Sequence, residues 1–133
     1  MIWVVVDTNL FIAGRWNPKS HSNRILDLCI EGRLKPVTTP EIKDENFYIL
    51  SKVNPPKDYL DKIFKFYQKS LRVRPKKRIG DCEDPSDNRF LEAAVESSAE
   101  YIITSDRHLL KLHPYHGIKI LKPSAFMREH SLQ

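Results

Sequence analysis

The sequence has few of the features that mark secreted or membrane-bound proteins. Only two of its 133 residues are cysteines, Cys29 and Cys82, so it offers no disulfide framework and no Cys-x-x-Cys pair, and we expect both thiols to be reduced. No apolar run approaches the ~18 residues that a membrane span needs. The N-terminus enters an apolar segment directly, without the basic stretch and cleavage site of a signal peptide. These absences predict a cytoplasmic protein without a membrane-spanning segment.

Length and charge limit the class further. Residues 1–133 contain no internal repeat and no low-complexity segment, and a chain of this length is predicted to form a single domain. The apolar fraction of 41% is ordinary for a globular protein with a buried core. The formal net charge of +5 suits a nucleic-acid partner, although many basic proteins bind none. Charge alone therefore leaves nucleic-acid binding open.

Apolar segments alternate with helical patterns along the chain. The first and fourth segments are almost entirely apolar, as expected of strands that are buried on both faces. The predicted strands are residues 2–6, 35–38, 71–74, 101–104 and 118–121. The predicted helices are residues 21–32, 40–52, 57–70, 85–98 and a short one after Ser105, with only a tail after Lys122. This alternation predicts an α/β fold in which a parallel sheet lies between two layers of helices.

Four acidic residues lie near the ends of these elements. Asp7 and Asp106 follow the first and fourth strands, Glu45 lies in helix 40–52, and Asp87 lies at the start of helix 85–98. Open α/β sheets bind ligands at the carboxyl ends of their strands, where the first and fourth strands can be neighbours. Two carboxylates ~4 Å apart repel by about 4 kcal/mol at an effective dielectric constant of ~20, so converging acids require protons or a cation. Because no Cys/His ligand set lies nearby, the simplest cation is Mg²⁺ or Mn²⁺.

Each acid also has a possible structural role. Asp84 precedes a proline and is a good N-cap, and Asp87 then takes the third position of a capping box. Asp106 would lie in a first helical turn, where the helix dipole favours an anion. Glu45 can equally be a solvated helix residue. Asp7 differs because it lies between two apolar runs, where an unpaired charge is costly, and this position favours a functional role.

Four motifs resemble those of the PIN-domain family of metal-dependent ribonucleases, and the resemblance covers nearly the whole chain. The motifs are Val4-Val5-Val6-Asp7-Thr8-Asn9, Thr39-Pro40-Glu41-Ile42-Lys43-Asp44-Glu45, the segment from Asp84 to Ala94, and Tyr101-Ile102-Ile103-Thr104-Ser105-Asp106. Their order and spacing together are fairly specific. The second motif leaves Glu41 and Glu45 as alternatives, of which Glu45 is the better match. Asn46 departs from the pattern, because the family more often has an aliphatic residue there.

The resemblance implies a three-layer α/β/α fold with five parallel strands in the order 3-2-1-4-5. It implies an endoribonuclease that uses Mg²⁺ or Mn²⁺ to hydrolyse RNA, with both catalysis and metal binding assigned to Asp7, Glu45, Asp87 and Asp106. The residues expected to orient these ligands or their waters are Thr8, Asn9, Asp84 and Ser105, with capping the other role of Asp84. Many small members are VapC-like toxins of type II toxin–antitoxin pairs, so a cognate antitoxin and a homodimer are the expected protein partners.

Two further segments are candidate binding surfaces. A basic cluster just before the third acidic motif either holds RNA phosphates or forms a solvated loop, and its members are Arg72, Arg74, Lys76, Lys77 and Arg78. Helix 57–70 carries aromatic residues that cannot all lie on one core stripe, namely Tyr59, Phe64, Phe66 and Tyr67. Core packing is the simpler explanation for them, and an antitoxin or dimer surface is the alternative.

Two other functions remain open on the sequence. A non-catalytic RNA-binding module on the same fold would keep RNA binding with a degraded metal site, and the departure at Asn46 motivates this alternative. A phosphotransferase that forms an aspartyl phosphate also suits Asp-Thr after a strand, and it would trap phosphate on Asp7. Metal-dependent RNA cleavage is the function that the four acids favour.

Overall fold

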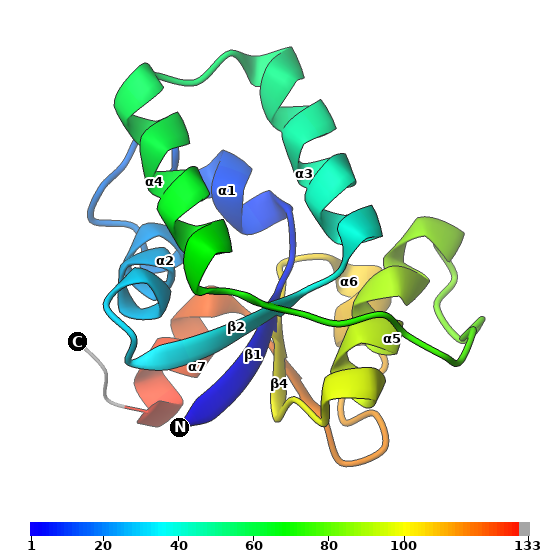
Figure 1. The fold of residues 1–133 in the computed structure, drawn as a ribbon. Helices are drawn as coiled ribbons and strands as arrows, with labels where there is room; N and C mark the ends of the chain where they lie inside the picture. Colours follow the sequence, from blue (N-terminus) through cyan, green and yellow to red (C-terminus); the bar gives the residue numbers. More distant parts are fainter. Residues whose placement is uncertain (131–133) are drawn as a thin grey trace.

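A parallel sheet of five strands lies at the centre of the computed structural model, which describes residues 1–130 (Figure 1). The strands are β1 (Ile2–Val6), β2 (Leu34–Thr38), β3 (Leu71–Arg72), β4 (Tyr101–Ile103) and β5 (Lys119–Leu121). They pair in the order β3-β2-β1-β4-β5, and each of these pairings is parallel. The order and the direction of the strands confirm the predicted topology.

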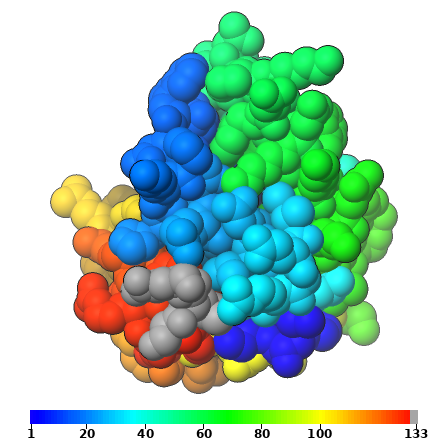
Figure 2. Space-filling model, turned by 90° about the vertical axis from the view of Figure 1, so that its left-hand side faces the viewer, coloured from blue at the N-terminus to red at the C-terminus, as the bar shows by residue number. Residues whose placement is uncertain are grey.

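Helices cover both faces of the sheet. The α-helices described within residues 1–130 are α1 (Asn9–Gly14), α2 (His21–Ile30), α3 (Pro40–Val53), α4 (Lys57–Lys69), α5 (Asn88–Ser97), α6 (Arg107–Leu110) and α7 (Pro123–His130), and a 3₁₀ turn, η1 (Pro85–Asp87), leads into α5. One face is covered by α2, α4 and α7, and the other by α5 and α6 (Figure 1). Figure 2 shows the first face, where α2 lies between α4 (green) and α7 (red). This arrangement confirms the three-layer α/β/α architecture.

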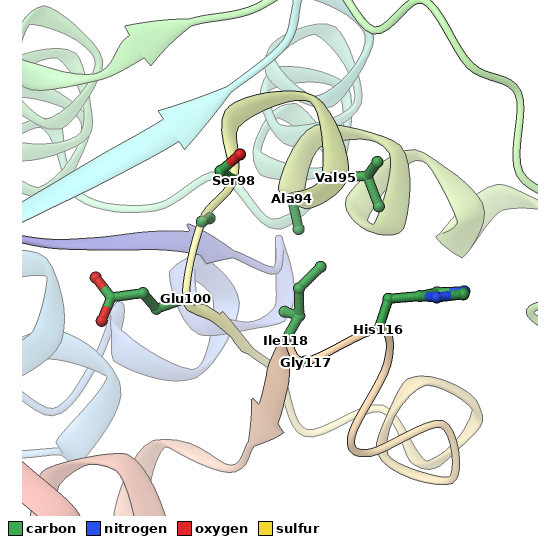
Figure 3. A pocket seen from close by; sticks show the side chains of 8 residues that line it. Ala94, Val95, Ser98, Glu100, His116, Gly117 and Ile118 are labelled. Carbon is green, nitrogen blue, oxygen red and sulfur yellow. The ribbon is translucent and has the colours of Figure 1, made fainter.

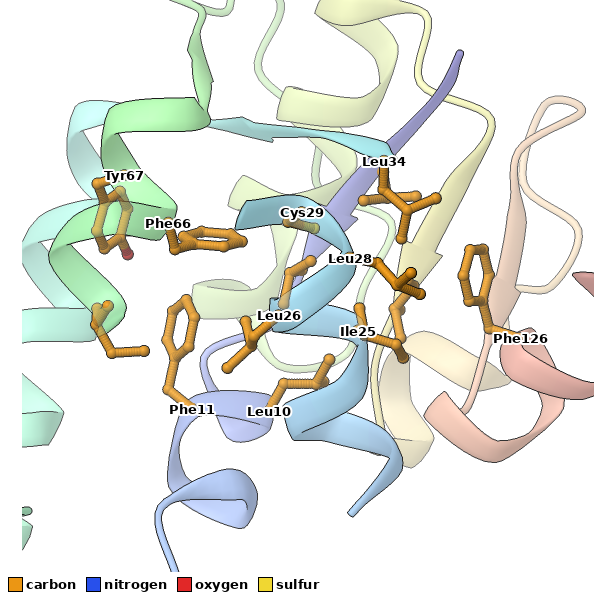
Figure 4. Close-up of a cluster of buried hydrophobic side chains, with 14 of the residues drawn as sticks. Leu10, Phe11, Ile25, Leu26, Leu28, Cys29, Leu34, Phe66, Tyr67 and Phe126 are labelled. Carbon is orange, nitrogen blue, oxygen red and sulfur yellow. The ribbon is translucent and has the colours of Figure 1, made fainter. Parts of the chain in front are cut away.

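The apolar strand β1 contributes side chains to both faces. Val4 and Val6 belong to the cluster under α2 and α4, whereas Val5 belongs to the cluster under α5. Successive side chains of a strand point to opposite faces, so a strand buried on both sides must be apolar throughout. In the first cluster, the rings of Phe11 and Phe66 meet edge to face with centroids 5.2 Å apart (Figure 4). Both faces of the sheet are therefore packed against apolar side chains.

Local signals set the ends of α3. The Thr39 hydroxyl accepts a hydrogen bond from Ile42 N at 3.1 Å and caps the first turn of the helix. Asn54 adopts the left-handed conformation, with φ of 48°, and ends the helix. Two prolines, Pro55 and Pro56, then separate α3 from α4. The second acidic motif is thus carried on a well-defined helix that starts at the carboxyl end of β2.

Three segments differ from the prediction. The strand β3 ends at Arg72, so residues 73–84 form a loop where the sequence predicts a strand that continues to residue 74. The residues after Lys122 form α7 instead of a tail, and its Phe126 and Met127 are fully buried. The helix α1 is not predicted. These segments are too short for a periodic pattern to identify them, and tertiary packing decides their conformation.

The structure agrees with the expectations for the cysteines and for membrane-spanning segments. Both cysteines are free thiols, as predicted; Cys29 lies buried in the core on α2, and Cys82 is also buried although its sequence surroundings are polar. No helix found within residues 1–130 has both the length and the apolar character needed to cross a bilayer.

Candidate metal centre

The site begins where the two central strands end side by side. β1 and β4 are paired, with Val6 opposite Ile103, so the residues that follow them leave the sheet together. Asp7 N donates to the Ile103 carbonyl at 3.0 Å and continues the ladder by one step. Asp7 and Thr104 are therefore held at the same carboxyl edge of the sheet, where parallel α/β sheets place their binding sites.

Thr104 connects two of the acids. Its hydroxyl donates to Asp7 Oδ2 at 2.5 Å and accepts a hydrogen bond from Asp106 N at 2.9 Å. Thr104 is completely buried, whereas Ser105, which the sequence singled out, is exposed. Sequence reasoning missed Thr104, because only the pairing of β1 with β4 reveals which of the two neighbouring hydroxyls faces Asp7.

Asp7 is buried and strongly held. It is only 4% exposed, and its Oδ1 accepts a hydrogen bond from Asn9 N at 3.2 Å. Burial raises the pKa of Asp7, the hydrogen bonds from Thr104 and Asn9 oppose this change, and the charge of Asp106 adds to it. The Asn9 contribution comes from its backbone N–H, and its side chain is exposed. Asp7 is thus a buried carboxylate whose orientation is fixed by hydrogen bonds.

Three further acids approach one point. One carboxylate oxygen from each of Asp84, Asp87 and Asp106 lies within 4.8 Å of the other two. Asp87 is 7% exposed, and its Oδ2 is buried with no hydrogen-bond partner among residues 1–130. Burial, and then the proximity of Asp106 and Asp7, raise the pKa of Asp87 to about 8. In the absence of a cation, Asp87 and Asp106 therefore retain a proton between them to a higher pH than an ordinary carboxylate does.

Asp84 both caps a helical turn and lies in the acidic cluster. Its Oδ1 accepts hydrogen bonds from Ser86 N at 3.1 Å and from Ser86 Oγ at 2.7 Å, so it caps η1. These hydrogen bonds lower the pKa of Asp84. It also lies in the cluster with Asp87 and Asp106. Capping and a place in the acidic cluster are compatible, because a carboxylate has two oxygens.

Glu45 completes the acidic site from α3. Burial and the charges of Asp7 and Asp84 raise its pKa, and the nearby guanidinium of Arg89 opposes this change. Arg89 Nη1 lies 3.3 Å from Glu45 Oε2. The other glutamate of the motif, Glu41, is exposed and lies 3.5 Å from a different guanidinium. Of the two candidates, Glu45 is the one that faces the acids, and Arg89 is a further residue of the site that the sequence did not single out.

The unexpected residue Asn46 has a clear structural role. It is 1% exposed, its side-chain oxygen accepts a hydrogen bond from the Thr8 hydroxyl, and its amide donates to the Tyr67 hydroxyl. It thereby connects the start of α1 with α3 and α4. A buried amide is tolerated when its polar atoms are paired, and this is why an aliphatic residue is not required here.

The two candidate surfaces differ in character. The basic cluster lies on β3 and the loop after it, and its five cationic residues are all exposed, namely Arg72, Arg74, Lys76, Lys77 and Arg78. On α4, Tyr59, Phe66 and Tyr67 are buried but Phe64 is 53% exposed, so the aromatic residues do not share one core stripe. Phe64 lies against Phe47 of α3, with ring centroids 5.4 Å apart.

A separate cavity lies away from the acids. Its volume is about 350 Å³, and its lining includes Ser98, Glu100 and His116 (Figure 3). These residues belong to the end of α5 and to the segments that precede β4 and β5, and therefore to the amino end of the strands. The acidic cluster is at the opposite, carboxyl end, so this cavity is not part of the candidate site.

The donor set fits a hard divalent cation. The converging side chains offer carboxylate oxygens, which are the ligands that Mg²⁺ and Mn²⁺ prefer. The buried Oδ2 of Asp87, which has no hydrogen-bond partner in the described part of the chain, is a second observation in favour of a cation, because such an oxygen otherwise costs free energy. The fold and the site together define a parallel α/β protein with an acidic centre at the ends of β1 and β4.

Comparison with known proteins identifies the family. The model of the PIN domain family matches residues 3–108, which is most of the chain, so the protein belongs to the PIN-domain family. It is similar to an uncharacterized protein of Methanocaldococcus jannaschii, with 35% identity over 147 aligned residues that cover 96% of this chain and 91% of the relative.

A solved structure shares the fold. A chain in the crystal structure of VapBC2 from Rickettsia felis, bound to a DNA fragment from its promoter, matches with a TM-score of 0.58. The match covers 91% of this chain and 98% of the other, at 14% sequence identity. At this level of identity the comparison supports the fold, and function has to be argued from the site.

Proposed function

We propose that the protein is a Mg²⁺- or Mn²⁺-dependent endoribonuclease that hydrolyses RNA phosphodiester bonds. The observation that carries the proposal is the approach of Asp84, Asp87 and Asp106 to one point, with a buried oxygen of Asp87 that has no partner within residues 1–130. Asp7 and Glu45 lie near this cluster, because the charge of Asp7 raises the pKa of Asp87 and the charges of Asp7 and Asp84 raise the pKa of Glu45. Membership of the PIN-domain family, whose members are generally metal-dependent nucleases, supports it.

In this proposal the four acids hold the metal and position the reacting groups. When bound, the ion lowers the pKa of a water ligand and stabilises negative charge on the phosphate. Thr104 contacts both the carboxylate of Asp7 and the backbone of Asp106, so it holds these two acids in place beside each other. Asp87 would hold the cation in its ionised form, because a nearby positive charge favours ionisation of a carboxyl group. Arg89 holds Glu45 beside them.

The substrate surface in this proposal is the basic cluster. Arg74, Lys76 and Lys77 are exposed on the loop that leads into the acidic centre at Asp84. Cations that neutralise phosphates supply most of the sequence-independent affinity for nucleic acids.

We further propose that the protein is the toxin of a type II pair, acts in the cytoplasm as a single catalytic domain, and is blocked by a cognate antitoxin. The structural likeness to a chain of a VapBC complex supports this proposal. An apolar groove between α3 and α4 has a volume of about 230 Å³ and is lined in part by Phe47, Leu60 and Phe64. Exposed apolar surface of this kind marks protein interfaces, and a homodimer is the alternative occupant.

RNA cleavage with and without metal tests the enzymatic proposal. We expect the wild type to cleave RNA in Mn²⁺ or Mg²⁺ and to stop in EDTA. Asp7→Asn should lose about 100-fold or more of the activity, since it removes the negative charge of a buried ligand. Asp61→Asn is the matched control, because Asp61 is an exposed acid on α4.

Three outcomes would contradict the proposal in different ways. Undiminished cleavage by Asp7→Asn would show that the site is wrongly assigned. RNA binding without metal-dependent cleavage would favour the non-catalytic module, although Asn46, which motivated that alternative, is accommodated by two hydrogen bonds. A phosphate trapped on Asp7 would favour the phosphotransferase.

A further inference from the structure

We infer that three side chains of α5 hold the basic loop, residues 73–84, in one conformation along the helix, and that Glu92 is a positioning residue for RNA. The loop runs from the end of β3 to the start of η1 and carries four of the five basic residues (Figure 1, green). The inference about RNA rests on the proposed function. The contacts between the loop and the helix are independent of it.

The three side chains accept backbone hydrogen bonds at regular intervals. Asn88 Oδ1 accepts from Cys82 N at 2.9 Å. Glu92 Oε2 accepts from Ile79 N at 2.9 Å. The third pair continues the series, since Glu96 Oε1 accepts from Lys76 N at 2.9 Å. We call these three acceptors, Asn88, Glu92 and Glu96, the α5 ladder.

The spacing of the α5 ladder matches the geometry of a helix and an extended chain. Residues four apart share one face of a helix and are separated by ~6 Å along its axis. Three residues of chain span at most ~10 Å. Each step of four residues along α5 corresponds to three residues backward along the loop, so the loop runs antiparallel to the helix and has enough length to reach every acceptor.

Glu92 is the central contact. It is only 7% exposed, and a buried carboxylate needs partners. Its Oε2 takes the Ile79 hydrogen bond, and its Oε1 lies 3.8 Å from Nη1 of Arg78. Arg78 also lies 3.5 Å from Glu41 of α3. Glu92 therefore holds both the backbone of the loop and one of its cations.

The α5 ladder sets the basic loop relative to the acidic centre. The loop ends at Asp84, which caps η1 beside Asp87. With its backbone tied at three points, the loop presents Lys76 and Lys77 as exposed cations on a fixed frame. A preorganised surface loses less conformational entropy when it binds, so the ladder should increase affinity for a phosphate backbone. The negative charges of the ladder would by themselves repel RNA, so their presence here is explained by positioning.

Removal of a negative charge should raise RNA affinity, whereas release of the loop should lower it, and the experiment distinguishes these two effects. RNA affinity is measured by fluorescence anisotropy with a labelled single-stranded RNA in EDTA, which prevents cleavage. Glu92→Ala, Glu96→Ala and the control Glu100→Ala each remove one negative charge and raise the formal net charge from +5 to +6. Glu100 is exposed and lies after α5, at the amino end of β4. Charge alone predicts that all three variants bind RNA at least as tightly as the wild type.

Positioning predicts the opposite for the ladder residues. Glu92→Ala should bind RNA about 3- to 10-fold more weakly, because the released loop has to be ordered on binding. Glu92→Gln keeps an acceptor for Ile79 N and should stay within about 2-fold of the wild type. Hydrogen exchange at Ile79 should be faster in Glu92→Ala and unchanged in Glu100→Ala.

Two results separate failure of this inference from failure of the proposed function. If Ile79 exchanges faster in Glu92→Ala but RNA binds as tightly as to Glu100→Ala, the inference is overturned. If the wild type binds no RNA, the proposed function fails and, with it, the role for RNA, while hydrogen exchange still tests the ladder. If Glu92→Ala does not fold, Glu96→Ala and the exchange of the Lys76 amide provide the same comparison at a less buried position.

Discussion

The clearest physical consequence of the acidic centre is its effect on stability, and Asp87 is the residue that tests it. Its pKa lies near 8 in the folded protein, against an ordinary value of 3.8. The folded state therefore binds more protons than the unfolded state between about pH 4 and pH 8. Since stability falls with pH wherever the folded state binds more protons, the metal-free protein should lose stability across this interval.

The magnitude follows from the same displacement. A pKa raised from 3.8 to about 8 corresponds to at most about 6 kcal/mol of unfolding free energy. Solvent at the site reduces this cost, and the interaction with Asp106 divides the displacement between two carboxylates, so we expect about 1–3 kcal/mol. For a chain of this size, 1 kcal/mol corresponds to a melting temperature change of roughly 3–5 °C.

Thermal melts of the wild type and Asp87→Asn in EDTA, at pH 5, 7 and 9, measure this effect. Asparagine has nearly the same shape and no charge, so Asp87→Asn should be more stable than the wild type at pH 9 and similar to it at pH 5. Added Mn²⁺ should stabilise the wild type by about 2.7 kcal/mol at a concentration 100 times the dissociation constant, and the variant by less. Parallel pH dependence in the two proteins, or the same response to metal, would refute the reasoning.

Three other residues yield predictions from their contacts. Thr104→Val removes the hydrogen bond to Asp7 without changing the shape of the side chain, so RNA cleavage should fall by about 10- to 100-fold while the circular dichroism spectrum is retained. Arg89→Ala removes the cation that lowers the pKa of Glu45, so the acidic limb of the pH–rate profile should move to higher pH, and an unmoved limb would exclude this role. Asn46→Leu introduces an aliphatic residue of the kind that the family favours but leaves two buried hydroxyls without their partner, so urea unfolding should show a loss of about 1–3 kcal/mol.

Asn46 departs from the family motif, yet this departure leaves the acidic site unchanged. On sequence, an amide beside Glu45 suggested a degraded centre. In the folded protein, this amide lies on a different side of α3, between the Thr8 and Tyr67 hydroxyls. Glu45 still lies near Asp7 and Asp84, because its direction is set by the helix and not by the nature of its neighbour.

Much of the architecture was predictable from local patterns. The run Val4-Val5-Val6 predicted a strand buried on both faces, because neighbouring side chains of a strand alternate in direction. The alternation of strands and helices predicted the parallel sheet, and the positions of Asp7 and Asp106 after strands predicted acids at its carboxyl edge. The strand order, by contrast, came from the resemblance of the four motifs to those of a known family.

The sequence alone determined the longer helices, the main strands and the acids that are available, because periodicity, capping residues and charge are local properties of the chain. The short segments α1 and α7 were decided by tertiary packing. Only the tertiary structure decided that Thr104 and not Ser105 contacts Asp7, that Glu45 and not Glu41 faces the acids, and that α5 holds the basic loop. Each of these outcomes depends on strand pairing or on the rotation of a helix against its neighbours. Such contacts join residues far apart in the chain, so the spacing of residues along one segment does not predict them.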